Sequence, residues 1–145
     1  STADITDMVR AIEAKHVMVV ADACYSGTLL RDSNARMDTS RDRNVWLKRI
    51  LGKRARTVLS SGGNEPVLDS GGGAHSVFAK AFLGALRDSP DVIDGVSLFE
   101  QVRRPVVLNS DQTPQYADIR NAGHDGGEFV FVRRKDPDAP RRDTN

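Results

Sequence analysis

The residues best suited to chemistry lie together in the segment DACYSG, residues 22–27, directly after a short apolar run. The run is His16–Ala21 (HVMVVA), whose β-branched residues predict a buried strand. Reactive groups of α/β proteins gather where parallel strands end, and the backbone N–H groups there favour a thiolate. A lone Cys is more often a small packed side chain, but Cys24 follows the apolar run and stands among polar residues. The segment therefore predicts a nucleophilic thiol at Cys24.

Further patterns predict the elements that hold this segment in place. Apolar residues at helical spacing predict a helix over residues 3–14, before the strand. Residues 56–60 (RTVLS) are a second strand candidate, and the apolar stripe over residues 77–86 predicts a long helix after it. Alternating helices and strands are typical of α/β domains. We therefore expect a three-layer α/β fold with a mostly parallel sheet flanked by helices, and few strands for the chain length.

The rest of the chain divides into short elements and polar loops. Ser97 and Glu100 match the S-x-x-E capping box, which predicts a helix over residues 98–108. Residues 31–44 contain almost no apolar side chain, which predicts a long mobile loop. The other expected segments are a helix over residues 45–51, a Gly-rich loop over 61–73, a polar loop over 109–127, a strand over 128–132 and a loose tail over 133–145.

The composition is that of one globular domain, and it excludes several classes of function. The chain has 145 residues, with 21 Lys and Arg against 20 Asp and Glu and a net charge of +1. Near-neutral charge predicts no nucleic-acid partner, and no apolar run approaches the roughly 20 residues of a membrane span. The single Cys excludes an internal disulfide, and no signal segment follows Ser1, so we expect a cytoplasmic protein. Residues 61–73 match neither the P-loop nor the dinucleotide-binding pattern, which argues against a nucleotide-binding domain.

The segment DACYSG after an apolar strand resembles the nucleophile segment of caspase-like cysteine peptidases, and most closely of their bacterial and metacaspase-type members. The resemblance continues in order through RTVLSSGGNEPV, GGGAHSVFAKAFLGAL and SDQTPQYADI followed by GGEFVFV, and it covers residues 4–132. Asp22 departs from the Q-A-C-x-G pattern of caspases and resembles the metacaspase pattern. The resemblance implies a caspase-like (caspase–hemoglobinase) fold over residues 1–132 and a cysteine endopeptidase with Cys24 as nucleophile, whose chemistry requires no cofactor.

A thiol peptidase also needs a base, which takes the thiol proton and later protonates the leaving amine. In caspases this His lies about 50 residues upstream of the Cys, whereas only 23 residues precede Cys24. His16 begins the strand that leads to Cys24, about 26 Å away when extended. His75 and His124 lie in loops without the His-Gly motif of the family. We therefore expect the chain to be the C-terminal part of the catalytic domain, inactive alone, with the catalytic His on an upstream segment or separate chain.

Asp22 is the residue that bears on the choice of substrate. A carboxylate at a strand end is commonly satisfied by backbone N–H groups, but beside a nucleophile it is also suited to pair with a cation. The resemblance to metacaspases implies the second role, and hence cleavage of proteins or peptides after Arg or Lys at P1. Ser61 follows the second strand and is a further candidate for the same pocket, with ordinary turn chemistry as the equal alternative. Glu65 and Asp69 are two more acids near that strand end.

Two regulatory expectations accompany this interpretation. The loop over residues 31–44 contains four Arg residues, which predicts autoprocessing of a zymogen by a peptidase that cuts after Arg. Some metacaspases require calcium, and Asp32, Asp38 and Asp42 offer oxygen ligands for it. Their spacing is not that of an EF-hand, so calcium stays an open alternative as activator, without an assigned site.

The main alternative is a caspase-like domain without turnover, acting as a regulatory or protein-interaction module. Such an inactive relative would lack the catalytic His, as this chain does at the family's position. A His-Gly pair at the end of an upstream strand would favour the peptidase, and another residue at that position would favour the module.

Overall fold

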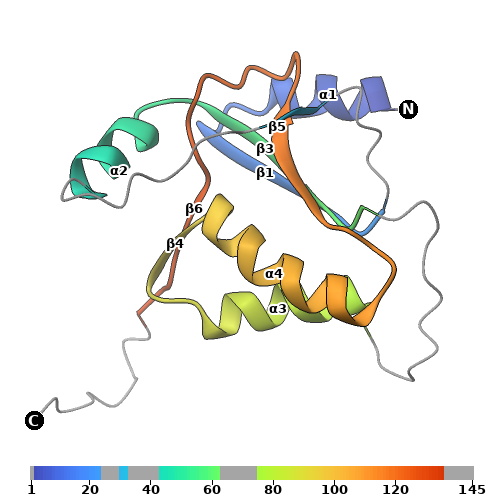
Figure 1. Cartoon of the computed structure of the whole chain (residues 1–145). Helices are drawn as coiled ribbons and strands as arrows, with labels where there is room; N and C mark the ends of the chain where they lie inside the picture. Colours follow the sequence, from blue (N-terminus) through green and yellow to red (C-terminus); the bar gives the residue numbers. More distant parts are fainter. Residues whose placement is uncertain (1, 24–29, 33–42, 63–74, 136–145) are drawn as a thin grey trace, which may run out of the picture.

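The computed structural model describes residues 2–23, 30–32, 43–62 and 75–135. Cys24 and most of the loops expected over residues 31–44 and 61–73 lie outside the described residues. The helices are α1 (Thr2–Ala11), α2 (Arg43–Leu51), α3 (Val77–Asp88) and α4 (Gly95–Asn109). The strands are β1 (His16–Ala21), β2 (Leu30–Asp32), β3 (Ala55–Ser60), β4 (Val92–Asp94), β5 (Gln115–Ile119) and β6 (Val130–Val132) (Figure 1).

The described strands form two sheets, one with the order β1-β3-β5-β2 and one that pairs β4 with β6. β1 and β3 confirm the two strands expected over residues 16–21 and 56–60, and they run parallel, with Ala21 opposite Ser60 at their ends. β5 is antiparallel to both β3 and β2. The fold is therefore mixed α/β, and the expectation of a mostly parallel sheet is wrong for the described strands. The reason is β5, which returns from the end of α4 in the opposite direction and has the alternating burial of an antiparallel strand.

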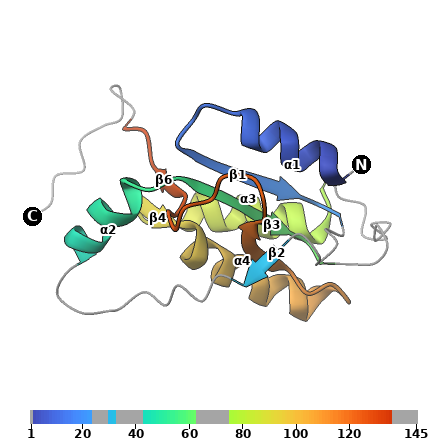
Figure 2. The same cartoon turned by 90° about the horizontal axis from the view of Figure 1, so that it is seen from above.

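The larger sheet carries helices on both faces. Helix α1 covers one face, and α3 and α4 cover the other (Figures 1 and 2). Side chains alternate along a strand, so successive residues of β3 serve the two faces in turn. Val58 belongs to a buried cluster with Val9 of α1 and Ile119 of β5, whereas Leu59 packs in a second cluster with α3 and α4. Because every residue of β3 is buried, this strand joins both layers of the core.

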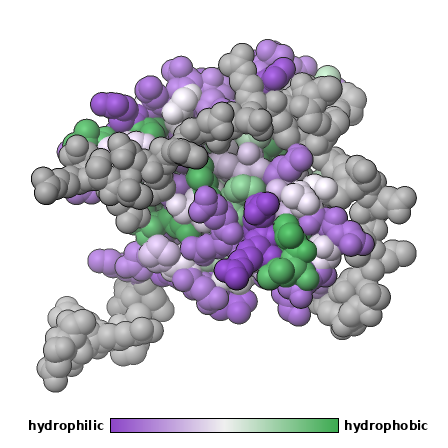
Figure 3. Space-filling model, in the orientation of Figure 1, coloured by the Kyte–Doolittle hydropathy of each residue, from purple (hydrophilic) through white to green (hydrophobic). Residues whose placement is uncertain are grey.

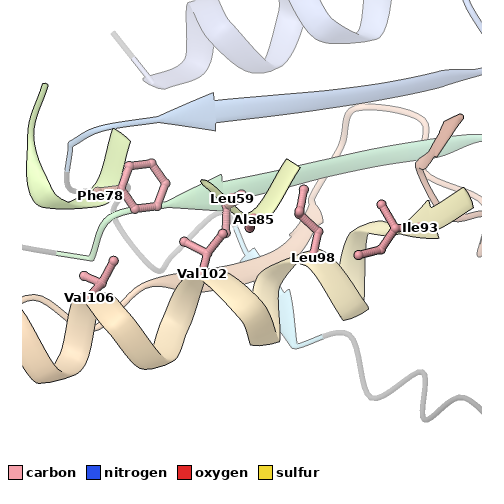
Figure 4. Packing of buried hydrophobic residues seen from close by; sticks show 7 residues of the cluster. All are labelled: Leu59, Phe78, Ala85, Ile93, Leu98, Val102 and Val106. Carbon is pink, nitrogen blue, oxygen red and sulfur yellow. The ribbon is translucent and has the colours of Figure 1, made fainter. Parts of the chain in front are cut away.

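The larger core cluster lies between β3 and the helices α3 and α4 (Figure 4). Leu98, Val102 and Val106 recur every four residues along α4, and each has an exposed fraction of 0%. Phe78 and Ala85 of α3 complete this cluster. Full burial of a Leu, Val or Phe side chain contributes about 1.5–3 kcal/mol. The cluster therefore fixes α3 and α4 against the sheet, including the point where α3 begins.

Helix α4 begins earlier than the sequence predicts. Asp94 is its N-cap, and the Asp94 carboxylate accepts the backbone N–H of Ser97 at 3.1 Å. Ser97 thus lies inside the first turn, and the expectation that Ser97 and Glu100 form a capping box at the start of the helix is wrong. The physical reason is that β4 leads directly into α4, so the last residue of the strand caps the helix.

Two segments that were expected to be loops contain strands. Strand β2 takes in the first two residues of the loop expected over 31–44, and β5 lies inside the loop expected over 109–127. Neither strand has an apolar run like the one that identified β1. Their backbone groups are nevertheless satisfied by pairing with each other, and β5 also pairs with β3.

Strand β3 contains a buried Arg near its start. Arg56 has an exposed fraction of 0%, and its guanidinium donates to the carbonyl oxygens of Val9, Ile12 and Lys15 at 3.2, 2.7 and 3.0 Å. These carbonyls lie at the end of α1 and just beyond it. A helix leaves its last C=O groups unpaired there and favours a cation, so Arg56 ties α1 to β3.

Candidate functional site

The candidate site lies at the edge of the larger sheet where β1 and β3 both end. Ala21 pairs with Ser60 at the last position of the two strands, and the Ser61 N–H donates to the carbonyl oxygen of Ala21 at 3.0 Å. Parallel neighbours bring their carboxyl ends to the same edge. Asp22 and Ser61, the two binding residues expected from the sequence, therefore follow adjacent strand ends. We call this place the β1–β3 edge.

The carboxylate of Asp22 is held by a residue from a distant part of the chain. Asp22 is exposed, and its Oδ2 accepts a hydrogen bond from the hydroxyl of Ser76, 54 positions later. The Ser76 oxygen in turn accepts the N–H of Ala79 at 3.0 Å, which makes Ser76 the N-cap of α3. The β1–β3 edge therefore presents an anion whose orientation is set by the start of a helix.

Two serine hydroxyls are buried at the same edge. Ser60 and Ser61 have exposed fractions of 1% and 0%, and neither hydroxyl has a hydrogen-bond partner among the described residues. Buried hydroxyls are nearly always hydrogen-bonded, because an unsatisfied one costs about 1–3 kcal/mol. The end of β3 therefore carries two enclosed hydroxyls whose burial is a cost to the fold.

The segment before β5 also borders this edge. Gly62 has φ = 71°, and a Cβ atom at this residue would lie 1.8 Å from the carbonyl oxygen of Thr113. The left-handed backbone and the close approach together require glycine at this position. Gln115, the first residue of β5, lies opposite Ser60. The polar character of residues 109–127 did not predict that part of this segment would reach the edge.

Ser76 is a member of this site that sequence reasoning missed. Cys24, the expected nucleophile, follows Asp22 by two residues but lies outside the described residues. The structure thus brings together Asp22, Ser61 and Ser76, and the first two were expected. A signal for Ser76 existed, since Ser directly before a long apolar helical stripe is a favoured N-cap.

Within the described residues, no histidine is hydrogen-bonded to Asp22, Ser61 or Ser76. His16 lies at the start of β1, the opposite end of that strand from Asp22, with its Nε2 3.1 Å from the carbonyl oxygen of Lys53. His75 is exposed and directly precedes Ser76 in the chain.

His124, expected in a surface turn, is instead half-buried beside β3 and β5. Its Nδ1 accepts the backbone N–H of Arg56 at 2.9 Å, and its Nε2 lies 3.3 Å from Oδ2 of Asp118. Because Nδ1 accepts, the neutral ring carries its proton on Nε2, facing Asp118. Burial lowers the pKa of His124, although Asp118 acts in the opposite direction. His124 therefore joins two strands near the start of β3, at the end opposite Ser61.

A buried pair of Glu and Tyr links β5 to the start of α4. Glu128, expected as the first residue of the last strand, precedes that strand and is 6% exposed. Its carboxylate accepts the hydroxyl of Tyr116 and the N–H of Phe129, the latter at 2.9 Å. Burial raises the pKa of Glu128 to about 7 and also raises that of Tyr116. Gly95, the first residue of α4, allows this packing, since a Cβ atom there would lie 2.7 Å from Oε1 of Glu128.

A groove of about 550 Å³ runs along the outer side of α4 and contains none of the residues of the β1–β3 edge. Figure 3 shows hydrophobic side chains beside strongly hydrophilic ones in this area. Its lining residues are Phe99, Glu100, Arg103, Arg104, Val107 and Leu108.

The described residues give no metal site and no membrane span. No group of three or more His, Cys, Asp or Glu side chains within them is placed to hold a metal ion. Asp32 ends β2, and Asp38 and Asp42 lie outside the described ranges. In that part of the chain, no helix is both long and apolar enough to cross a membrane.

Comparison with known proteins assigns the chain to no family. No family model, no curated protein and no solved structure matches the chain.

Proposed function

We propose that the protein is a cysteine endopeptidase of caspase-like fold that cleaves after Arg or Lys, with Cys24 as its nucleophile. The observation that carries this proposal is the β1–β3 edge, where Asp22 and Ser61 follow adjacent strand ends. Asp22 lies two residues before Cys24 in the chain. A carboxylate held in place two residues from a thiol suits recognition of a cationic side chain next to the bond that is cut. The helices on both faces of the sheet are compatible with this fold.

The proposed reaction proceeds through a thioester. A histidine on an upstream segment or separate chain takes the proton of the Cys24 thiol, and the thiolate attacks the carbonyl carbon of the scissile bond. The N–H of Cys24 donates to the resulting oxyanion. The C–N bond then breaks, and the histidine returns the proton to the leaving amine. Water hydrolyses the thioester and restores the thiol.

Asp22 and Ser61 determine the substrate in this proposal. The Asp22 carboxylate pairs with the Arg or Lys side chain at P1. Ser61 is 0% exposed, and it supports the same pocket through the bond of its backbone N–H to Ala21, the residue before Asp22. An Asp at P1 would instead bring two carboxylates together, which is repulsive.

Fluorogenic peptides with Arg, Lys or Asp at P1 test the proposal, using protein that includes the upstream segment. We expect cleavage of the Arg and Lys peptides only, and loss of cleavage in Cys24→Ala. Asp22→Asn should lose the basic preference, and Asp88→Asn, which removes another exposed carboxylate at the end of α3, should keep it. Cleavage of the Asp peptide alone would contradict the role of Asp22.

Autoprocessing is tested on the same protein. We propose cleavage within residues 31–44 after one of the four Arg residues, namely Arg31, Arg36, Arg41 or Arg43. Mass spectrometry of incubated protein, with and without calcium, should find a new terminus there, and the Cys24→Ala variant should remain intact. An intact active protein would show that activation does not require this cut.

The second candidate function is a caspase-like regulatory or protein-interaction module without turnover. It is favoured by the positions of His16 and His124, which are bonded at the opposite ends of β1 and β3 from the β1–β3 edge. Failure to cleave any of the peptides, with or without calcium, in a protein that includes the upstream segment would support this module.

A further inference from the structure

Ser76 connects the Asp22 carboxylate to the rigid core of the domain. Its hydroxyl donates to Oδ2 of Asp22, and its oxygen accepts the N–H of Ala79 in the first turn of α3. Phe78, in the same first turn, is 1% exposed and lies in the larger core cluster. The core therefore holds the start of α3, and the start of α3 holds the carboxylate.

A bond to one carboxylate oxygen restricts rotation of the whole group. The terminal torsion of an Asp side chain is otherwise broad, so an exposed Asp samples many planes. Each carboxylate oxygen accepts about two hydrogen bonds. The bond from Ser76 uses one position on Oδ2, and positions on both oxygens of Asp22 remain for a ligand.

The two basic side chains respond differently to a carboxylate of fixed plane. A guanidinium is a flat fork whose two parallel N–H groups match the two oxygens of a carboxylate. An ammonium is a compact point charge with rotatable donors, and its attraction depends little on that plane. A fixed carboxylate therefore strengthens binding of Arg more than binding of Lys.

We propose that Ser76 is a positioning residue that fixes the plane of the Asp22 carboxylate and thereby favours Arg over Lys at P1. The inference rests on the proposed function, because it takes Asp22 as the acid that binds P1. It adds a determinant of specificity that belongs to α3 and lies 54 positions from Asp22 in the chain.

The test measures binding of N-acetyl-arginine amide and N-acetyl-lysine amide by NMR titration, because binding does not require turnover. Ser76→Gly removes the hydroxyl, while glycine remains acceptable at an N-cap position. Ser76→Thr restores the hydroxyl. Ser97→Ala is the matched control, because it also removes a serine hydroxyl that donates to an Asp in the first turn of a helix, here to Asp94 at 2.7 Å.

We expect the unsubstituted protein to bind the Arg amide more tightly than the Lys amide. Ser76→Gly should weaken binding of the Arg amide by about tenfold, because a free Asp22 side chain must then be ordered on binding, and binding of the Lys amide by less than about threefold. Ser76→Thr should restore the ratio between the two ligands, and Ser97→Ala should leave it unchanged. Thermal melts of each variant report whether the fold is retained.

The opposite results separate the two proposals. If Ser76→Gly left the ratio of the affinities for the Arg and Lys amides unchanged, and Asp22→Asn lost binding of the Arg amide, the positioning role would be overturned. The proposed function would remain. Equal binding of the Arg amide by Asp22→Asn and the unsubstituted protein, or no binding by either, would overturn the role of Asp22 and the inference together.

Discussion

Helices α3 and α4 lie side by side in the core, but their first turns use an Asp and a Ser in opposite ways. At α4 the Asp is the cap. The Asp94 carboxylate accepts hydrogen bonds from the backbone N–H of Ser97 at 3.1 Å and from the Ser97 hydroxyl at 2.7 Å. At α3 the Ser is the cap, and the Ser76 hydroxyl donates outward to Asp22, which belongs to the end of β1.

The difference shows when a carboxylate near a helix is available to a ligand. Asp94 is 3% exposed, and both of its carboxylate oxygens accept hydrogen bonds from Ser97 within its own turn. Asp22 is exposed and is oriented by a helix to which it does not belong. An acid that caps its own helix stabilises the fold, whereas an acid held by the cap of another helix keeps acceptor sites for a cation. Three of the four predictions below test this distinction, and the other concerns the buried Glu128.

The largest expected effect is that of Asp22→Asn on activity. We expect kcat/KM for an Arg peptide to fall by about 100-fold, because one partner of the charge pair with P1 is lost. The free energy of unfolding should change by less than about 0.5 kcal/mol, since Asp22 is exposed. Peptide cleavage and urea denaturation measure the two quantities. A large loss of stability with unchanged kcat/KM would place Asp22 in the same class as Asp94.

Asp94→Ala should show the reverse pattern. We expect the free energy of unfolding to fall by about 2 kcal/mol, because the variant loses the N-cap and leaves the backbone N–H of Ser97 without its acceptor. Binding of N-acetyl-arginine amide should be unchanged in the folded protein. Urea denaturation gives the stability. A specific loss of Arg binding at unchanged stability would remove the contrast between the two helices.

The sequence predicts the helices and strands whose own residues show an apolar pattern. β1 has an apolar run, β3 has a short β-strand pattern around Val58 and Leu59, and α3 has an apolar stripe, so all three were expected. β5 was missed because its sequence, QYADI, is mostly polar and its place in the sheet comes from pairing with β3 and β2. The start of α4 was misplaced because a local capping pattern was available three residues after the cap that is used.

The same division applies to the candidate site. Asp22 and Ser61 were expected, because each directly follows a strand that the sequence identifies. The bonds of Ser76 to Asp22 and of His124 to Arg56 join residues 54 and 68 positions apart. No local pattern encodes such a pairing, since it depends on which strand ends and helix starts the fold brings together.

A buried carboxyl group next to the start of α4 predicts a dependence of stability on pH. Burial raises the pKa of Glu128 from 4.5 to about 7. The folded protein therefore keeps a proton that the unfolded chain loses near pH 4.5. This proton stabilises the folded state, and the stabilisation is lost as the pH rises through about 7. We expect Glu128→Gln to remove roughly 1–2 kcal/mol of this decline between pH 5 and pH 8.

Urea denaturation of the unsubstituted protein and of Glu128→Gln at both pH values checks this expectation. Glu100→Gln, at an exposed position of α4, is the control and should retain the decline. Half-buried His124 has a lowered pKa and contributes a change of opposite sign in acid, but it is present in all three proteins. Identical pH dependence of Glu128→Gln and the unsubstituted protein would mean that the Glu128 side chain does not titrate in this range.

The smallest expected effect compares the two serines by stability alone. Ser76→Ala removes the N-cap acceptor of α3, so we expect the free energy of unfolding to fall by about 1 kcal/mol. Ser97→Ala removes the hydroxyl's bond to Asp94, whereas the backbone N–H of Ser97 keeps the same carboxylate as its acceptor. We therefore expect a loss of roughly 0.5 kcal/mol or less for Ser97→Ala, measured by urea denaturation. If Ser97→Ala were the more damaging substitution, the hydroxyl rather than the Asp94 carboxylate would hold the first turn of α4, and the contrast with α3 would fail.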